Sequence, residues 1–178
     1  MDTKLKGDIA EQAAILQGLK RGWGVLRPVG DRFPYDLVFD ISGILVKVQT
    51  KQAWYDELDR CYLLDNRRTK TNRRRMLRER YGPQDFDFAL AYLEDLDLFS
   101  VFPVDVFIAY AGQICIVESD KRQRRPRSAT YRDAWDLISH WAASREILMR
   151  SPVKVGEASC GGNPEPSSDG LVGEGVET

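Results

Sequence analysis

The chain has 178 residues, 43% of them hydrophobic, and a formal net charge of −1, which suits one globular domain with a substantial core. It contains no apolar run long enough to cross a membrane and no secretory signal pattern, so we predict no membrane partner and a cytoplasmic location. Three cysteines (Cys61, Cys115 and Cys160) and a single histidine (His140) exclude a Cys/His metal cluster and argue against a disulfide framework.

Residues 151–178 differ in composition from the rest of the chain. They carry five acidic residues, one basic residue, six glycines and three prolines, and they show no apolar period. Such a segment cannot bury enough apolar surface to offset the entropy lost on ordering. We therefore predict one domain over residues 1–150 and a disordered acidic tail over residues 151–178.

The first predicted element is a helix over residues 3–20, ended by Gly22. Glu11 lies beside Ala14 and Gly18, well off the most regular apolar stripe of this helix, so its carboxylate is either solvated or packed against the sheet. The stripe predicted to face the core consists of Leu5, Ile9, Ala13, Leu16 and Leu19.

Three strands are predicted next, over residues 23–27, 34–40 and 44–51, each short and rich in apolar residues. The Ser42-Gly43 pair between the last two favours a tight hairpin turn. These two strands should therefore pair antiparallel, with the start of the first beside the end of the second.

Polar side chains gather at that end of the hairpin. Residues two apart in a strand share a face, so Gln49 and Lys51 point to one side while Val46 and Val48 point to the other. Asp36 opens the first strand and should lie near the end of the second. A carboxylate, an amide and an ammonium then meet at one place, which indicates a functional site.

Two basic clusters follow the hairpin. Residues 67–80 hold eight basic residues and one acidic residue, a one-sign run that raises self-repulsion unless phosphates neutralise it. We predict that this run contacts a polyanion, and the alternative is a solvated loop. Residues 121–127 add five basic residues in a predicted exposed loop. The predicted DNA-binding residues are Arg67, Arg68, Lys70, Arg73, Arg74, Arg75, Arg78, Lys121, Arg122, Arg124 and Arg125.

The remaining elements complete an α/β pattern. An acidic turn at residues 94–97 separates two of the strands, and a helix is predicted to begin at residue 129. Tyr131, Trp135 and Ile138 of this helix keep helical spacing and are predicted to face the core. The further strands are predicted over residues 61–64, 86–93, 98–106, 107–110 and 114–117.

Four short segments resemble the PD-(D/E)XK nuclease superfamily, and specifically its small bacterial branch of group I intron-encoded homing endonucleases. The segments are Gly7-Asp8-Ile9-Ala10-Glu11, Tyr35-Asp36-Leu37-Val38, Val48-Gln49-Thr50-Lys51 and Tyr131-Arg132-Asp133-Ala134-Trp135. Gln49 stands where most superfamily members carry Asp or Glu, and glutamine is expected there in this branch. The resemblance covers residues 4–140 and leaves the tail outside.

The resemblance implies a restriction-endonuclease-like α/β fold, a mixed β-sheet flanked by helices. It assigns catalytic roles to Glu11, Asp36, Gln49 and Lys51. The implied cofactor is Mg2+, with Mn2+ as a substitute, held by Asp36, Glu11 and the backbone carbonyl of Thr50, because hard cations take oxygen ligands. The implied substrate is double-stranded DNA, and the implied assembly is a homo-oligomer, a dimer or tetramer, since one such site cuts one strand.

Other interpretations of the same residues remain open. The first is a nuclease selective for Holliday junctions, or a restriction-like defence nuclease. The second is a catalytically inactive DNA-binding protein on the same fold, which would bind with a steep salt dependence and without nicking. The third is a scaffold in which Asp36, Gln49 and Lys51 are a surface polar trio, so that neither metal nor DNA would shift its melting temperature.

Overall fold

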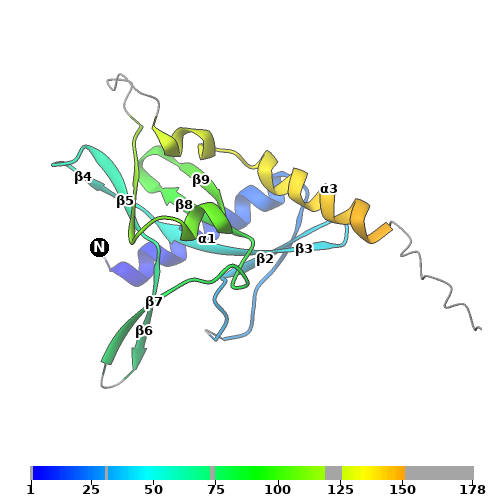
Figure 1. The fold of residues 1–178 in the computed structure, drawn as a ribbon, viewed down its shortest axis with the longest axis horizontal. Helices are drawn as coiled ribbons and strands as arrows, with labels where there is room; N and C mark the ends of the chain where they lie inside the picture. Colours follow the sequence, from blue (N-terminus) through cyan, green and yellow to red (C-terminus); the bar gives the residue numbers. More distant parts are fainter. Residues whose placement is uncertain (1, 31, 73–74, 119–125, 151–178) are drawn as a thin grey trace, which may run out of the picture.

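The computed structural model describes residues 2–30, 32–72, 75–118 and 126–150, with the backbone alone for residues 69–72 and 75–77. A five-stranded sheet in the order β1-β2-β3-β8-β9 forms its centre. β3 and β8 run parallel while the other neighbours run antiparallel, so the sheet is mixed, as predicted (Figure 1). Its strands are β1 (Gly24–Leu26), β2 (Leu37–Ile41), β3 (Ile44–Gln52), β8 (Phe88–Leu93) and β9 (Leu98–Pro103).

The predicted hairpin joins β2 to β3 at the centre of this sheet. Ser42 and Gly43 have φ angles of 54° and 86°, the left-handed values that a two-residue turn of type I′ requires. The Asp40 carboxylate accepts a hydrogen bond from the Gly43 N–H at 2.8 Å and closes the turn. The turn sets a register that places Leu37 opposite Val48, so the start of β2 lies beside the last residues of β3.

Two helices, α1 (Thr3–Lys20) and α3 (Asp136–Arg150), pack on one face of the sheet. Asp2 caps the start of α1 by accepting a hydrogen bond from the Lys4 N–H at 3.0 Å. Between these helices and the sheet lies one hydrophobic cluster, which includes Ala10, Ala14, Phe39, Val46, Val48, Trp135, Ile138 and Ala142.

The face of α1 that packs on the sheet differs from the predicted stripe. A Cβ at Gly18 would lie only 2.7 Å from Cε1 of Phe39, so the helix approaches the sheet more closely there than a larger residue would permit. Close approach therefore selects the small residues for burial and leaves the leucines outside. Ala10, Ala14 and Gly18 are buried, whereas Leu5, Leu16 and Leu19 are 48%, 52% and 57% exposed.

The opposite face of the central sheet is covered by a three-stranded sheet in the order β10-β5-β4 and by the short helix α2 (Val104–Ile108). The strands are β4 (Trp54–Asp56), β5 (Cys61–Asp65) and β10 (Gln113–Ile116). A second hydrophobic cluster lies between the two layers and includes Tyr62, Leu64, Tyr81, Phe86, Phe102, Phe107 and Ile114.

The predictions for two segments, near α2 and α3, were wrong. Residues 104–108 form α2 in place of a strand, because Pro103 ends β9 with a φ of −56° that suits the start of a helix. The predicted helix from residue 129 begins instead as a 3-10 turn (Arg127–Tyr131), and Asp133 with a φ of 45° separates that turn from α3. Trp135 and Ile138 are buried, as predicted.

Cys61 and Cys115 form a disulfide between β5 and β10, with their Cα atoms 5.9 Å apart. The sequence argued against a disulfide framework because its three cysteines are few, scattered and odd in number, but the antiparallel pairing of β5 with β10 brings two of them together across 54 positions. Cys160 and the predicted tail over residues 151–178 lie outside the described residues. In the described part of the chain, none of the helices has the length and apolar character that spanning a bilayer demands.

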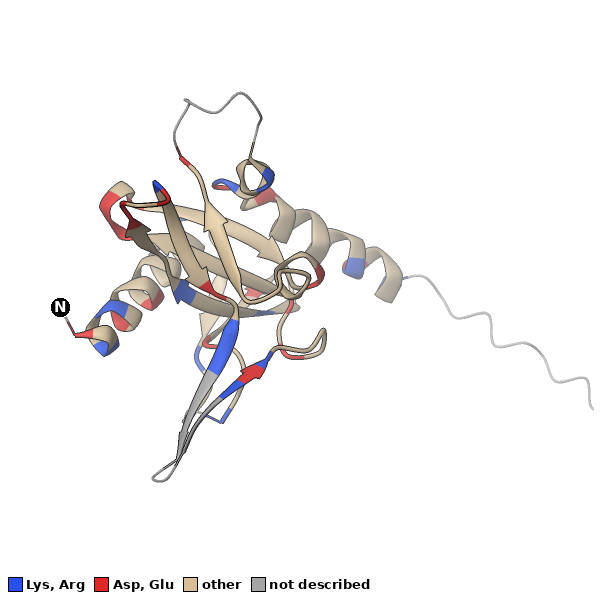
Figure 2. Cartoon of the chain, turned by 60° about the vertical axis from the view of Figure 1, so that its left-hand side comes forward, with Lys and Arg blue, Asp and Glu red and all other residues tan. Residues whose placement is uncertain are grey.

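A two-stranded hairpin of β6 (Arg67–Asn72) and β7 (Arg75–Arg80) projects from the body (Figures 1 and 2). The sequence pattern predicted no strands here and left a solvated loop as the alternative to a polyanion contact. A regular antiparallel register runs along the whole hairpin, from Arg67 opposite Arg80 to Asn72 opposite Arg75. The basic run is therefore carried on an extended, regular arm that continues directly from β5.

Candidate active site

Asp36 meets the end of β3, as the strand pattern predicted. The Asp36 N–H donates to the Val48 carbonyl at 2.9 Å and thereby extends the β2–β3 pairing by one residue. Its side-chain Oδ2 accepts two hydrogen bonds, from the Gln49 amide nitrogen at 2.6 Å and from the Thr50 N–H at 2.8 Å. Gln49 is 8% exposed and Thr50 is 7% exposed, so these polar groups meet where little water reaches.

The surroundings of Asp36 oppose its ionisation. Burial raises the pKa of Asp36 to about 6, against the pull of the Thr50 N–H. The negative charge of Glu11 raises this pKa further, while the positive charges of Lys51 and Arg68 lower it. Three charged side chains therefore act on Asp36 electrostatically, and a cation would favour its ionised form.

Lys51 sits on the same face of β3 as Gln49, two residues further along. Its ammonium donates a hydrogen bond to the backbone carbonyl of Arg67 at 3.1 Å. Burial lowers the pKa of Lys51, and the charges of Asp36 and Asp65 oppose that shift. The ammonium thus lies in the electrostatic field of Asp36 while it is anchored at the base of the β6–β7 hairpin.

Glu11 projects from α1 and is partly buried, with 23% of its side chain exposed. Of the two alternatives, the packed position is the one that the structure has, because the small residues beside Glu11 draw this side of α1 onto the sheet. Glu11 forms an ion pair with Arg27, which follows β1, at 2.5 Å. Sequence reasoning missed Arg27, since no local pattern links the end of β1 to the middle of α1.

The basic residues of the predicted DNA-binding set fall into four groups. Arg67 and Arg78 flank Asp65, with nitrogen–oxygen distances of 2.9 and 3.7 Å. Arg68 donates to the backbone carbonyl of Phe33 at 2.9 Å and so ties the hairpin to the segment before β2. Lys70 and Arg75 lie in β6 and β7. The remaining six, Arg73, Arg74, Lys121, Arg122, Arg124 and Arg125, lie outside the described residues.

Residues 1–138, more than half of the chain, match the PD-(D/E)XK endonuclease family. The chain belongs to this family. The solved structure of a bacterial homing endonuclease, I-Ssp6803I, is 60% identical in sequence, with a TM-score of 0.77 over 82% of this chain and 99% of that one. None of the proteins with curated descriptions matches. The resemblance seen in the sequence is confirmed, and so are the restriction-endonuclease-like fold and the activity of a DNA endonuclease.

PD-(D/E)XK endonucleases generally use divalent metal ions, and the geometry around Asp36 fits one. The Gln49 amide nitrogen donates to Oδ2 of Asp36 at 2.6 Å and to the Thr50 carbonyl at 3.1 Å. Two oxygens thus converge on one electropositive group, as they must around a hard cation. Across the described ranges, no three His, Cys, Asp or Glu side chains gather into a metal cluster.

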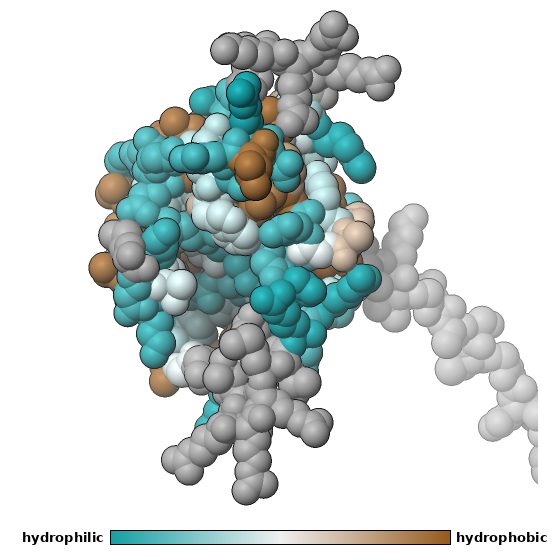
Figure 3. Space-filling model, turned by 90° about the vertical axis from the view of Figure 1, so that its left-hand side faces the viewer, coloured by the Kyte–Doolittle hydropathy of each residue, from teal (hydrophilic) through white to brown (hydrophobic). Residues whose placement is uncertain are grey.

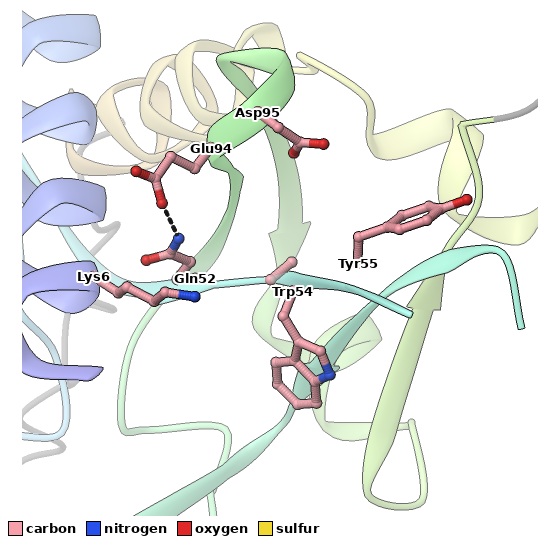
Figure 4. Close-up of a pocket in the computed structure, with 7 residues that line it drawn as sticks. Lys6, Gln52, Trp54, Tyr55, Glu94 and Asp95 are labelled. Carbon is pink, nitrogen blue, oxygen red and sulfur yellow. Dashed lines mark hydrogen bonds between the residues drawn. The ribbon is translucent and has the colours of Figure 1, made fainter. Parts of the chain in front are cut away.

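A separate pocket of about 410 Å³ opens beyond the end of β3 (Figure 4). Gln52 lines it and donates to the Glu94 carboxylate at 2.6 Å. Because successive residues of a strand point to opposite faces, the side chains of Gln52 and Lys51 diverge, and this pocket is distinct from the PD-(D/E)XK site. Figure 3 shows the side of the molecule that carries β4, a largely hydrophilic surface with scattered hydrophobic side chains. Lys6, Ala53, Trp54, Tyr55 and Asp95 complete the lining.

Proposed function

We propose that this PD-(D/E)XK endonuclease cuts double-stranded DNA at a specific sequence, in the manner of a homing endonuclease, with Mg2+ as its cofactor. The convergence of the Asp36 carboxylate and the Thr50 carbonyl on one point carries the proposal, since it provides hard oxygen ligands at the buried end of the central hairpin. The 60%-identical neighbour is a bacterial homing endonuclease, which supports the homing type of specificity. Mn2+ is expected to replace Mg2+, because both accept oxygen ligands.

Each residue of the proposed site has a distinct role. Asp36, Glu11 and the Thr50 carbonyl would hold the divalent ion, and that ion neutralises charge on the attacking and leaving oxygens of the phosphodiester. Gln49 holds the Asp36 carboxylate and the Thr50 carbonyl together in the ion-free protein, through hydrogen bonds at 2.6 and 3.1 Å, and adds no charge of its own. Lys51 places an ammonium beside the reacting phosphate, where it offsets negative charge and orients the attacking water.

The β6–β7 hairpin is the proposed DNA-binding arm. Its basic residues contact phosphates, and a two-stranded ribbon has the width that the major groove of B-DNA admits. Figure 2 shows the hairpin extending from the body with basic residues where it begins. Arg68 lies at that point, and its charge acts on both Asp36 and Lys51, so the arm and the site share one electrostatic field.

The proposed active form is a cytoplasmic homo-oligomer, a dimer or tetramer of the domain over residues 1–150. One site hydrolyses one strand, so a cut through both strands needs a second copy. Leu16 and Leu19 support this assembly, because they place apolar surface on the outer side of α1 at 52% and 57% exposure. Sedimentation velocity on wild type and on the Leu16→Glu/Leu19→Glu variant tests it; a wild type that sediments as a monomer at every concentration contradicts it.

The experiment that tests the activity is cleavage of plasmid and genomic fragments with Mg2+ or with EDTA. Discrete products are expected from the wild type with Mg2+, and none from Asp36→Ala, from Lys51→Ala or with EDTA. The exposed positions Glu57 and Lys20 supply matched controls, Glu57→Ala and Lys20→Ala, which should cleave as the wild type does. A wild type that cuts only a four-way junction would make the enzyme junction-selective, and one that binds DNA without cutting it would contradict the catalytic roles.

A further inference from the structure

Lys51 is anchored by the two strands of the β6–β7 hairpin where they leave the body. On one side its ammonium donates to the carbonyl of Arg67, the first residue of β6, at 3.1 Å. On the other side the ammonium lies 5.2 Å from the ring centroid of Tyr81, the residue that directly follows β7. Arg67 pairs with Arg80 across the hairpin, so one anchor lies on the first rung of the ladder and the other directly follows it, at the base of the hairpin.

The ring of Tyr81 is held in place by two other aromatic rings. It packs edge-on against Phe86, with centroids 5.0 Å apart and an angle of 73°, and it is tilted on Phe107 at 6.1 Å. Tyr81 is 7% exposed and belongs to the second hydrophobic cluster. It therefore forms a rigid wall for Lys51, while the free end of the hairpin extends away from the body.

The chemistry of this wall suits a half-buried ammonium. A lysine that loses hydration tends to lose its proton, and an aromatic face compensates because its quadrupole attracts a cation. The hydroxyl contributes differently: burial raises the pKa of Tyr81, and the negative charge of Asp36 raises it further. The phenol therefore stays neutral, and its ring face is the group that acts on Lys51.

We propose that Tyr81 is a positioning residue, which holds the Lys51 ammonium at the active site and, with the Arg67 carbonyl, couples its position to the DNA-binding hairpin. This inference rests on the proposed role of Lys51 in DNA cleavage. It follows that DNA bound along the hairpin acts on the base of the hairpin, which anchors the lysine. Binding of the substrate and placement of the catalytic ammonium thus become one event.

Two substitutions separate this role from simple core packing. Tyr81→Leu keeps an apolar side chain and removes the aromatic face, whereas Tyr81→Phe keeps the face and removes the hydroxyl. Phe102→Leu is the matched control, because Phe102 is fully buried in the same cluster and its ring contacts are with Phe107, Tyr110 and Tyr131. All three variants are first compared by thermal unfolding, so that a loss of stability is measured separately.

The first readout is the pKa of Lys51, followed by NMR of ε-13C-labelled lysine and assigned with Lys51→Arg. Tyr81→Leu is expected to lower this pKa by about one unit, the equivalent of a lost cation–π contact, while Tyr81→Phe restores it. Phe102→Leu should destabilise the fold without moving the pKa. An unchanged pKa in Tyr81→Leu, or an equal fall in Phe102→Leu, overturns the inference.

The second readout is single-turnover cleavage, across a pH series, of a duplex that the wild type cuts. Tyr81→Leu is expected to cut about tenfold more slowly, with the alkaline limb of its profile moved to lower pH, and Tyr81→Phe to restore both. A loss of rate that is equal at every pH, with the alkaline limb unmoved, would contradict the positioning role. If the wild type cuts no duplex, the proposed function fails. The titration of Lys51 then still decides whether Tyr81 holds the ammonium or only packs in the hydrophobic core.

Discussion

The buried Asp36 carboxyl group, in its ionised form, destabilises the folded protein. A carboxyl group whose pKa is raised to about 6 costs free energy whenever it is ionised in the folded state. In the proposed site the ionised form is the one that would bind a cation, and that binding would offset the cost. Gln49 and the Thr50 N–H relieve part of it, since both donate to the same carboxylate oxygen.

This environment predicts how stability depends on pH. The folded pKa of Asp36 lies above its ordinary value of 3.8, so its favourable contribution is complete below about pH 4 and is lost as pH rises through about 6. The wild type should therefore lose up to about 3 kcal/mol relative to Asp36→Asn between pH 4 and pH 8 in metal-free buffer.

Urea unfolding of both proteins across the pH series measures this difference. The exposed Asp8 of α1 offers a control for loss of a carboxylate as such, through Asp8→Asn. Wild type and Asp36→Asn curves that run parallel from pH 4 to pH 8 would show that Asp36 is solvated in the free protein.

At the scale of the element, α1 illustrates how a helix can bring a carboxylate onto a sheet through its small residues. Gly18→Ala should destabilise the protein by about 1–3 kcal/mol, because the added Cβ would lie 2.7 Å from Cε1 of Phe39. Gly7→Ala in the same helix meets nothing within 4 Å and should stabilise by about 0.5–1 kcal/mol. Denaturant unfolding compares the two; a stabilising Gly18→Ala would mean that α1 sits further from the sheet.

The hairpin β6–β7 carries a prediction about DNA binding. Arg78 has 54% of its side chain exposed and lies 3.7 Å from Asp65, so it remains available to a phosphate. Arg78→Ala should weaken binding to all duplexes alike and reduce the slope of log K against log salt by about one. Fluorescence anisotropy at several salt concentrations measures the slope. Arg150→Ala, at the end of α3, is the control. An equal change of slope in that variant would mean that the slope reflects the overall charge of the protein and not a contact made by the hairpin.

The extent to which each element was predictable depends on how local its determinants are. The hairpin of β2 and β3 follows from its strand pattern and the Ser42-Gly43 turn, and that register alone brings Asp36 to Gln49. The buried face of α1 depends on its distance from Phe39, which no pattern within the helix encodes. The β6–β7 hairpin was missed because its charges masked the alternation of Thr69 and Thr71 with longer polar residues.

At the scale of the whole molecule, the candidate active site lies where three separate parts of the fold meet. The helix layer supplies Glu11, the central sheet supplies Asp36, Gln49 and Lys51, and the hairpin supplies the carbonyl that anchors the lysine. The hairpin continues directly from β5, so the position of its base depends on the small sheet of β4, β5 and β10. The Cys61–Cys115 disulfide joins β5 to β10 within that sheet.

The disulfide gives the last prediction. Its two cysteines are 54 residues apart, and cross-linking a loop of that length lowers the entropy of the unfolded chain enough to stabilise the fold by about 4 kcal/mol. Oxidised wild type should therefore unfold at a higher urea concentration than the same protein with dithiothreitol. A Cys61→Ser/Cys115→Ser variant should match the reduced protein and ignore the reductant. Because reducing conditions prevail in the cytoplasm, the dithiol form must also cleave DNA if the proposed location holds. Equal unfolding curves with and without reductant would show that the two thiols stay unlinked, and loss of cleavage on reduction would contradict a cytoplasmic enzyme.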